Sequence, residues 1–175
     1  YTQQPNSKSQ EKHFRYVLKG FSFQFVSDNG VFSKNTIDFG SQILIESYEV
    51  PSSFQEGKLL DVGCGYGPMG LSFAKAYPKM HVEMVDVNER ALELARRNAK
   101  ANGIENVSIH ESSIYDAINA NDYSVIISNP PIRAGKEVVH RILEEAYDYL
   151  IDGGQLVIVI QKKQGAPSME TFMEE

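Results

Sequence analysis

Short apolar runs alternate with segments of helical periodicity from residue 58 onward. Helix-like segments run from Pro68 to Pro78, from Asn88 to Gly103 and over residues 137–150. This alternation is typical of βαβ units, so it predicts an α/β fold with a mostly parallel sheet. Such a sheet binds its ligands beyond the carboxyl ends of its strands, where we expect the strand-ending loops to share one crevice. The expected strands cover residues 58–62, 81–87, 107–111, 123–128 and 155–161.

The residues before this region predict a smaller appendage. Alternating phenylalanines over 21–25, turn residues at 28–30 and the apolar pair 31–32 predict a β-hairpin. A helix with Asp38 or Ser41 as its N-cap follows and ends before Pro51. We therefore expect a flexible polar tail over residues 1–10 and one domain over 11–175. Its hairpin and helix occupy 11–57 and its sheet core occupies 58–175.

Composition narrows the class of protein. The 175 residues are 42% hydrophobic and 23% charged, which is ordinary for one globular domain. No apolar stretch is long enough to span a bilayer and the polar start lacks a signal-peptide core, so we expect a cytoplasmic protein with no membrane partner. A single cysteine, Cys64, excludes an internal disulfide, and the four histidines lack metal-ligand spacing, so we expect no metal. The net charge of −6 argues against a general basic field for nucleic acid but permits a local basic patch. The sequence does not indicate an oligomeric state.

A glycine-rich segment, LLDVGCGYGPMG, leads from the first expected strand into a helix. Its glycines permit a tight turn and a close approach of the backbone to a ligand. A triphosphate loop is disfavoured because the Gly-Lys-Ser/Thr ending is missing. A dinucleotide site fits equally well, since Gly65, Gly67 and Gly70 also satisfy G-x-G-x-x-G and Asp86 follows about 20 residues later. Asp61 breaks the tie: a carboxylate there suits a cationic amino group but repels a pyrophosphate.

A second loop, Asn129-Pro130-Pro131-Ile132, ends the strand at 123–128. The prolines fix φ and remove two backbone donors, which leaves rigid carbonyl groups facing the expected crevice. If an amino group donates its two N–H bonds to the Asn129 side-chain oxygen and the Pro130 carbonyl, its nitrogen lone pair is directed at a reaction partner without the help of a strong base. The alternative is an ordinary Asn-Pro turn.

These motifs resemble those of class I S-adenosylmethionine-dependent methyltransferases, which have a Rossmann-like sheet. The stretches NPPIRAGK and GVFSKNTIDFGSQILIES are similar to the 16S ribosomal RNA guanine-N2 methyltransferases that act at guanine 1207. The resemblance covers roughly residues 11–170. It implies seven strands, of which the last two are absent from these residues, and we expect PSMETFMEE to begin a final helix.

The resemblance also implies three groups of site residues. The catalytic loop is Asn129, Pro130, Pro131 and Ile132. The cofactor-binding residues are Asp61, Gly63, Cys64, Gly65, Gly67, Asp86, Val87, Ser112, Ser113, Ile114 and Asn129, with Asp86 on the ribose hydroxyls and residues 112–114 beside the adenine. The substrate-binding residues are Phe32, Lys34, Asp38, Ser41, Arg133 and Lys136, the last two on RNA phosphate.

Several of these residues have simpler structural explanations. Phe32 suits a core position, Lys34 a solvated hairpin charge, and Cys64 a small packed residue rather than a nucleophile. Ser112 and Ser113 fit a turn equally well. Ile132 departs from the resemblance, because related amino-methyltransferases carry an aromatic residue there to stack on the acceptor.

The predicted function is therefore transfer of a methyl group from S-adenosylmethionine to the N2 amine of a guanine in 16S ribosomal RNA. We expect the RNA to be presented within the small ribosomal subunit, with a basic cluster of Lys34, Arg133, Lys136 and Arg141 reading its surface. The alternatives are a glutamine-N5 or other amino methyltransferase, and a cofactor-binding interaction module without catalysis.

Overall fold

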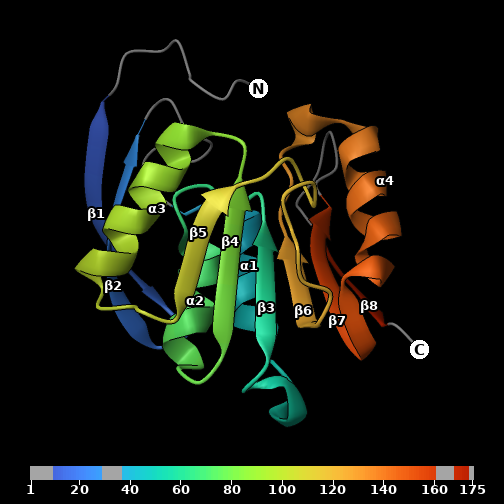
Figure 1. The fold of residues 1–175 in the computed structure, drawn as a ribbon. Coiled ribbons are helices and arrows are strands. Elements are labelled where there is room, and N and C mark those ends of the chain that lie inside the picture. The colour runs from blue at the N-terminus through green and yellow to red at the C-terminus, as the bar shows by residue number, and fades with distance from the viewer. Residues whose placement is uncertain (1–9, 29–36, 161–167, 174–175) are drawn as a thin grey trace.

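The computed structural model describes residues 10–28, 37–160 and 168–173 (Figure 1). The predicted tail up to residue 9 lies outside this range, as do the hairpin residues Val31 and Phe32 and the predicted substrate residue Lys34. Among the described residues, no helix combines the length and the apolar character that crossing a membrane requires.

A six-stranded sheet forms the centre of the molecule, in the order β5-β4-β3-β6-β7-β8 (Figure 1). Five strands are parallel, and β8 runs antiparallel to β7. Val62 pairs with both Val85 and Ser128, so the carboxyl ends of the three central strands are level. The strands are β3 (Lys58–Val62), β4 (His81–Asp86), β5 (Val107–Glu111), β6 (Tyr123–Ser128), β7 (Leu150–Ile160) and β8 (Ser168–Met173).

The predicted final helix is wrong. Residues 168–173 form strand β8, because the long strand β7 offers an edge along which six residues pair. The sheet therefore has six strands, and the expectation that the last two of seven are both absent is also wrong. The helix expected over 137–150 is also shorter than predicted. It ends at Glu145 and is followed by a 3-10 turn, Ala146–Asp148, while Gly153 and Gly154 lie inside β7 rather than behind the helix.

Helices cover both faces of the sheet and bury its apolar side chains in two clusters. One face packs against α1 (Phe39–Ser47), α2 (Pro68–Ala76) and α3 (Glu89–Ala101). The opposite face packs against α4 (Lys136–Glu145) and the loop containing Tyr115 and Ile118. The predicted N-caps Asp38 and Asn88 are confirmed, since their side-chain oxygens accept from the N–H groups of Ser41 and Ala91 at 3.1 and 3.2 Å.

The N-terminal hairpin consists of β1 (Glu11–Leu18) and β2 (Phe21–Asp28). Strand β2 was predicted, but the turn that joins it to its described partner lies at Lys19 and Gly20, both with positive φ. The partner β1 was missed because its inward residues Phe14, Tyr16 and Leu18 alternate only briefly with polar ones, and the exposed Val17 between the last two is itself apolar.

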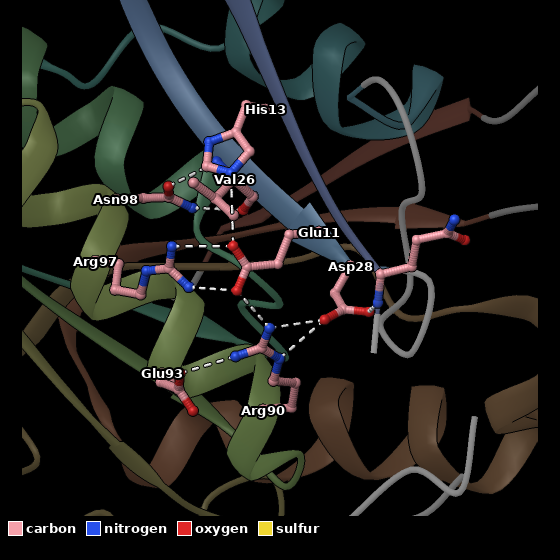
Figure 2. Close-up of polar contacts among 9 residues, drawn as sticks. Glu11, His13, Val26, Asp28, Arg90, Glu93, Arg97 and Asn98 are labelled. Atoms are coloured by element: carbon pink, nitrogen blue, oxygen red, sulfur yellow. Dashed lines mark hydrogen bonds and ion pairs between the residues drawn. The ribbon is translucent and has the colours of Figure 1, made fainter. Parts of the chain in front are cut away.

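Helix α3 holds this hairpin through paired amide and ionic contacts (Figure 2). The Asn98 side chain accepts from the Val26 N–H and donates to the Val26 carbonyl, and Asn102, one helical turn later, makes the same two bonds with Gln24. The two asparagines thus cover the outer edge of β2, which would otherwise be left open. Asn98 also donates to the carbonyl of Tyr66 at 2.9 Å, so the hairpin, α3 and the glycine loop meet at one buried amide.

Candidate active site

A cavity of about 260 Å³ opens at the carboxyl ends of β3 and β6. The strand order reverses between these two neighbours, and an open α/β sheet binds its ligands at this switch point. Residues from the glycine loop, the end of β4, the 112–114 turn, the proline loop and α4 contribute to its wall. The lining residues are Val62, Gly63, Asp86, Val87, Ser112, Ser113, Ile114, Ser128, Pro130, Pro131, Arg133, Ala134, Val138 and Ile142.

The glycine loop turns sharply between β3 and α2. Gly63, Gly65 and Gly67 all have positive φ, which a residue with a side chain adopts only at a cost. A Cβ at Gly63 or Gly65 would meet no other atom within 4 Å, whereas one at Gly67 would lie 2.8 Å from the Leu71 side chain. The first two glycines therefore leave open space for a ligand, and Gly67 permits close packing beneath the loop.

Asp86 ends β4 and presents its carboxylate to the cavity. Its Oδ2 accepts from the Gly65 N–H at 2.8 Å and its Oδ1 accepts from the Asn88 N–H at 2.9 Å. These two bonds fix the orientation of the carboxylate at the cavity wall. Asp86 as a residue is 2% exposed, which places its side chain in a region of low dielectric.

Asp61 lies beneath the glycine loop and does not line the cavity. Its Oδ2 accepts from the Gly70 N–H at 2.9 Å, while its Oδ1 is buried without a partner among the described residues. Complete burial, with a contribution from the nearby Asp86 charge, raises the pKa of Asp61 to about 7. Such a group gains by meeting a cationic ligand group, because the cation would offset the cost of the buried charge.

Cys64 faces away from the cavity into the apolar cluster beneath α2 and α3. Burial raises the pKa of its thiol well above the ordinary value, so the thiolate is disfavoured. Its predicted role as a packed residue rather than a nucleophile fits this position.

The turn after β5 places Ile114 in the cavity wall with an unusual backbone. Ile114 has a φ of 53°, a conformation that is costly for a β-branched residue. The Ser112 hydroxyl donates to the Ile114 carbonyl at 2.8 Å and accepts from the Ala117 N–H at 3.0 Å, which holds the turn closed. Ser112 is therefore buried support for Ile114, whereas Ser113 is exposed at the cavity.

The proline loop brings Pro130 and Pro131 to the cavity, while Asn129 turns its side chain toward α1. The Asn129 amide nitrogen donates to Asp38 Oδ2 at 2.6 Å and to the Ser41 hydroxyl at 3.0 Å. Ile132 lies outside the cavity and is 50% exposed. Lys136 begins α4 on the exposed surface.

The cavity brings together half of the predicted site residues that the structure describes. Gly63, Asp86, Val87, Ser112–Ile114, Pro130, Pro131 and Arg133 line it, whereas Asp38, Ser41 and Asn129 form a separate group beside it. Sequence reasoning missed the lining residues Val62, Ser128, Ala134, Val138 and Ile142, which read as ordinary strand and helix positions. These residues line the cavity only because their positions in the fold face it, and no sequence motif predicts that. Within the described residues, no group of three or more His, Cys, Asp or Glu side chains is placed to hold a metal ion.

Comparison with known proteins identifies the class. Residues 22–175 match the family model of the methyltransferase small domain. The chain is 49% identical to the uncharacterised Bacillus subtilis protein YbxB, over all of this chain and 87% of that protein. It is 38% identical to ribosomal RNA small subunit methyltransferase C of Vibrio vulnificus over 89% of this chain but only 46% of that protein, so it spans about half the length of that relative.

Among solved structures, one neighbour is the T. thermophilus 16S rRNA N2 G1207 methyltransferase (RsmC), determined in complex with AdoMet and guanosine. It superposes with a TM-score of 0.75 over 89% of this chain and 43% of that chain, at 24% identity. This likeness shows a shared fold.

The switch-point cavity, with a glycine loop on one side and an Asn-Pro-Pro loop on the other, defines an S-adenosylmethionine-dependent methyltransferase with a Rossmann-like sheet. The chain belongs to the methyltransferase small domain family. The predictions of the fold class, of an enzyme rather than a non-catalytic module, and of S-adenosylmethionine as cofactor are confirmed. The open Cβ positions at Gly63 and Gly65, the cavity carboxylate of Asp86 and the orphaned oxygen of Asp61 fit this cofactor.

Proposed function

We propose that this enzyme methylates the exocyclic N2 amine of a guanine in the 16S RNA of the small ribosomal subunit. The observation that carries the proposal is the shared cavity, where Pro130 and Pro131 of the acceptor loop lie across from Gly63 and Asp86 of the cofactor side. The similarity to the Vibrio vulnificus enzyme, whose name gives the small-subunit RNA as its substrate, supports the acceptor class. A ribosomal acceptor also implies a cytoplasmic enzyme.

On the cofactor side, S-adenosylmethionine supplies an electrophilic methyl group on a sulfonium centre. Asp86 accepts hydrogen bonds from the ribose hydroxyls, and Val87 and residues 112–114 bound the adenine. Gly63, Gly65 and Gly67 set the course of the loop, with Cys64 packed beneath it, and the carboxylate of Asp61 attracts the methionine amino group. These groups bind and orient, which converts transfer into an in-line displacement between fixed partners.

On the acceptor side, the side-chain amide oxygen of Asn129 and the backbone carbonyl of Pro130 accept hydrogen bonds from the two N–H groups of the guanine amine. The Pro131 carbonyl already accepts from the Ala134 N–H at 2.9 Å, which leaves Pro130 as the proline suited to this role. Ile132 offers an apolar surface near the base, and Arg133 and Lys136 meet the RNA phosphates. Phe32 and Lys34 belong to the same proposal but lie outside the described residues.

The charge pattern favours a shaped ribosomal surface over naked RNA. At −6, the chain has little long-range attraction for phosphate, so recognition depends on local contacts. Arg141 cannot be counted among them, since it pairs with both Asp116 and Glu145. A stacked guanine cannot present N2 to the methyl group, so it must turn outward at a cost of a few kcal/mol that these contacts offset.

Methyl transfer from labelled S-adenosylmethionine tests the proposal on four acceptors: small subunits lacking this modification, 16S RNA stripped of protein, large subunits and total cell protein. We expect label in N2-methylguanosine of the small-subunit RNA, with assembled or partly assembled particles as the better substrate. Label confined to protein, or to a nucleoside other than N2-methylguanosine, would contradict the assignment. Nucleoside mass mapping of a deletion strain gives the matching control, because the same N2-methylguanosine must disappear.

A further inference from the structure

The side-chain amide of Asn129 is hydrogen-bonded to the N-cap and the first turn of α1. Its nitrogen donates to Asp38 Oδ2 at 2.6 Å and to the Ser41 hydroxyl at 3.0 Å. Asn129 and Ser41 are 4% and 8% exposed, so water competes little for these bonds. Two segments about 90 residues apart in the sequence thus meet at one amide.

Asp38 decides which way this amide faces. A carboxylate can only accept hydrogen bonds, so it selects the amide nitrogen and rejects the amide oxygen. The oxygen is consequently directed away from α1. A bond to an ionised acceptor is also stronger than one between neutral groups. In the proposed reaction, the orientation that Asp38 selects is the one that presents an acceptor to the incoming amino group.

The close approach of α1 depends on Gly40. A Cβ there would lie 2.9 Å from the Val159 side chain, 3.1 Å from Asp38 Oδ2 and 3.3 Å from the Asn129 amide nitrogen. No side chain fits at this position without separating the groups that bond. The same Asp38 oxygen also caps α1 through the Ser41 N–H, so the helix terminus and the Asn129 amide share one acceptor.

We propose that Asp38 and Ser41 are positioning residues that hold the Asn129 amide with its carbonyl toward the acceptor amine. The proposal rests on the function proposed above and replaces direct substrate contact as the role of these two residues. Because a displaced catalytic group reduces the rate more than it reduces binding, the loss should fall on kcat.

The main test is Asp38→Ser. Serine still caps the helix but is too short to reach Asn129. We expect kcat to fall roughly 10- to 100-fold, the scale for a misplaced group in a site, with S-adenosylmethionine affinity by calorimetry and thermal midpoint close to those of the wild type. Asp38→Asn keeps an oxygen at the same place and should retain most of kcat.

Ser47→Ala, at the exposed far end of α1, is the matched control and should behave as wild type. Ser41→Ala provides a second route to the same loss if Asp38→Ser does not fold.

A double-mutant cycle separates this proposal from the proposed function. Asn129→Ala alone should abolish most turnover, and adding Asp38→Ser to it should cost nothing more, because Asp38 acts through Asn129. Three outcomes would overturn the positioning role while leaving the Asn129 assignment intact. These are a wild-type kcat in both Asp38→Ser and Ser41→Ala, a kcat of Asp38→Asn as low as that of Asp38→Ser, and losses of kcat that multiply in the double variant. Wild-type kcat in Asn129→Ala would overturn the acceptor-loop assignment itself, and the positioning role with it.

Discussion

The backbone N–H of Gly65 donates to Asp86 Oδ2 over 2.8 Å, and this bond joins the glycine loop to the neighbouring strand. The Asn88 N–H holds the other carboxylate oxygen at 2.9 Å. One carboxylate therefore fixes the course of the loop and faces the cavity at the same time. Mutation at Asp86 consequently affects both the loop and the ligand.

Asp86→Ala should weaken S-adenosylmethionine binding by roughly 1–3 kcal/mol, because the ribose hydroxyls lose a charged acceptor and the Gly65 N–H loses its partner. Isothermal titration calorimetry measures the change. Glu105→Ala removes an exposed carboxylate from the loop after α3 and serves as the control. Equal affinity of Asp86→Ala and the wild type would contradict the cofactor assignment.

Asp61→Asn should change the pH dependence of the unfolding free energy of the ligand-free enzyme and should also weaken S-adenosylmethionine binding. The folded-state pKa of Asp61 is about 7, above its ordinary value of 3.8, so between these values the folded chain binds more protons than the unfolded chain. The Asp61 contribution to the unfolding free energy therefore decreases as pH rises from about 4 to 7, on the order of 1 kcal/mol per pH unit.

Urea unfolding without cofactor at pH 5 and pH 8 tests this expectation. Relative to Asp61→Asn, the wild type should lose stability on going to pH 8. The variant should nevertheless bind S-adenosylmethionine less tightly, because the attraction to the amino group is gone. Unfolding free energies that change in parallel with pH in the two proteins would show that the Asp61 carboxyl is not perturbed.

Ser112→Ala should loosen the turn that carries Ile114. The variant loses two partly buried hydrogen bonds, one to the Ile114 carbonyl and one from the Ala117 N–H, at a cost of about 1–3 kcal/mol of unfolding free energy. Thermal or urea unfolding measures it. Ser113→Ala, one residue later and exposed, should unfold like the wild type. Equal losses in both variants would argue against the supporting role of Ser112.

Arg90→Ala should destabilise the attachment of the hairpin. Arg90 donates twice to Asp28, which is 1% exposed, so its loss removes a cationic partner from a buried carboxylate (Figure 2). Breaking such a pair costs roughly 3 kcal/mol. Arg97→Ala removes an arginine that is 40% exposed and pairs with Glu11, so its effect should be much smaller. Urea unfolding compares the two, and a greater loss in Arg97→Ala would refute this reasoning.

The sequence by itself determined the α/β class, the five parallel strands and the two loops that carry the chemistry. These features depend on local rules. Apolar strand runs alternate with amphipathic helical periods, and N-cap residues such as Asn88 mark the beginning of a helix. Glycines permit backbone conformations that other residues avoid, and prolines fix φ. The glycine loop and Asp86 lie within one βαβ unit, so their meeting followed from spacing alone.

The tertiary structure decided what depends on neighbours distant in the sequence. Strand β8 pairs with the edge of β7, and β1 pairs with β2. Neither pairing can be inferred from the residues of β8 or β1 alone, because strand formation depends on the neighbouring strand. The bond between Asp38 and Asn129 is a further example, because the approach of α1 to the loop after β6 depends on how Gly40 packs against Val159 of β7. Such contacts arise from the packing of whole elements, and no local pattern encodes them.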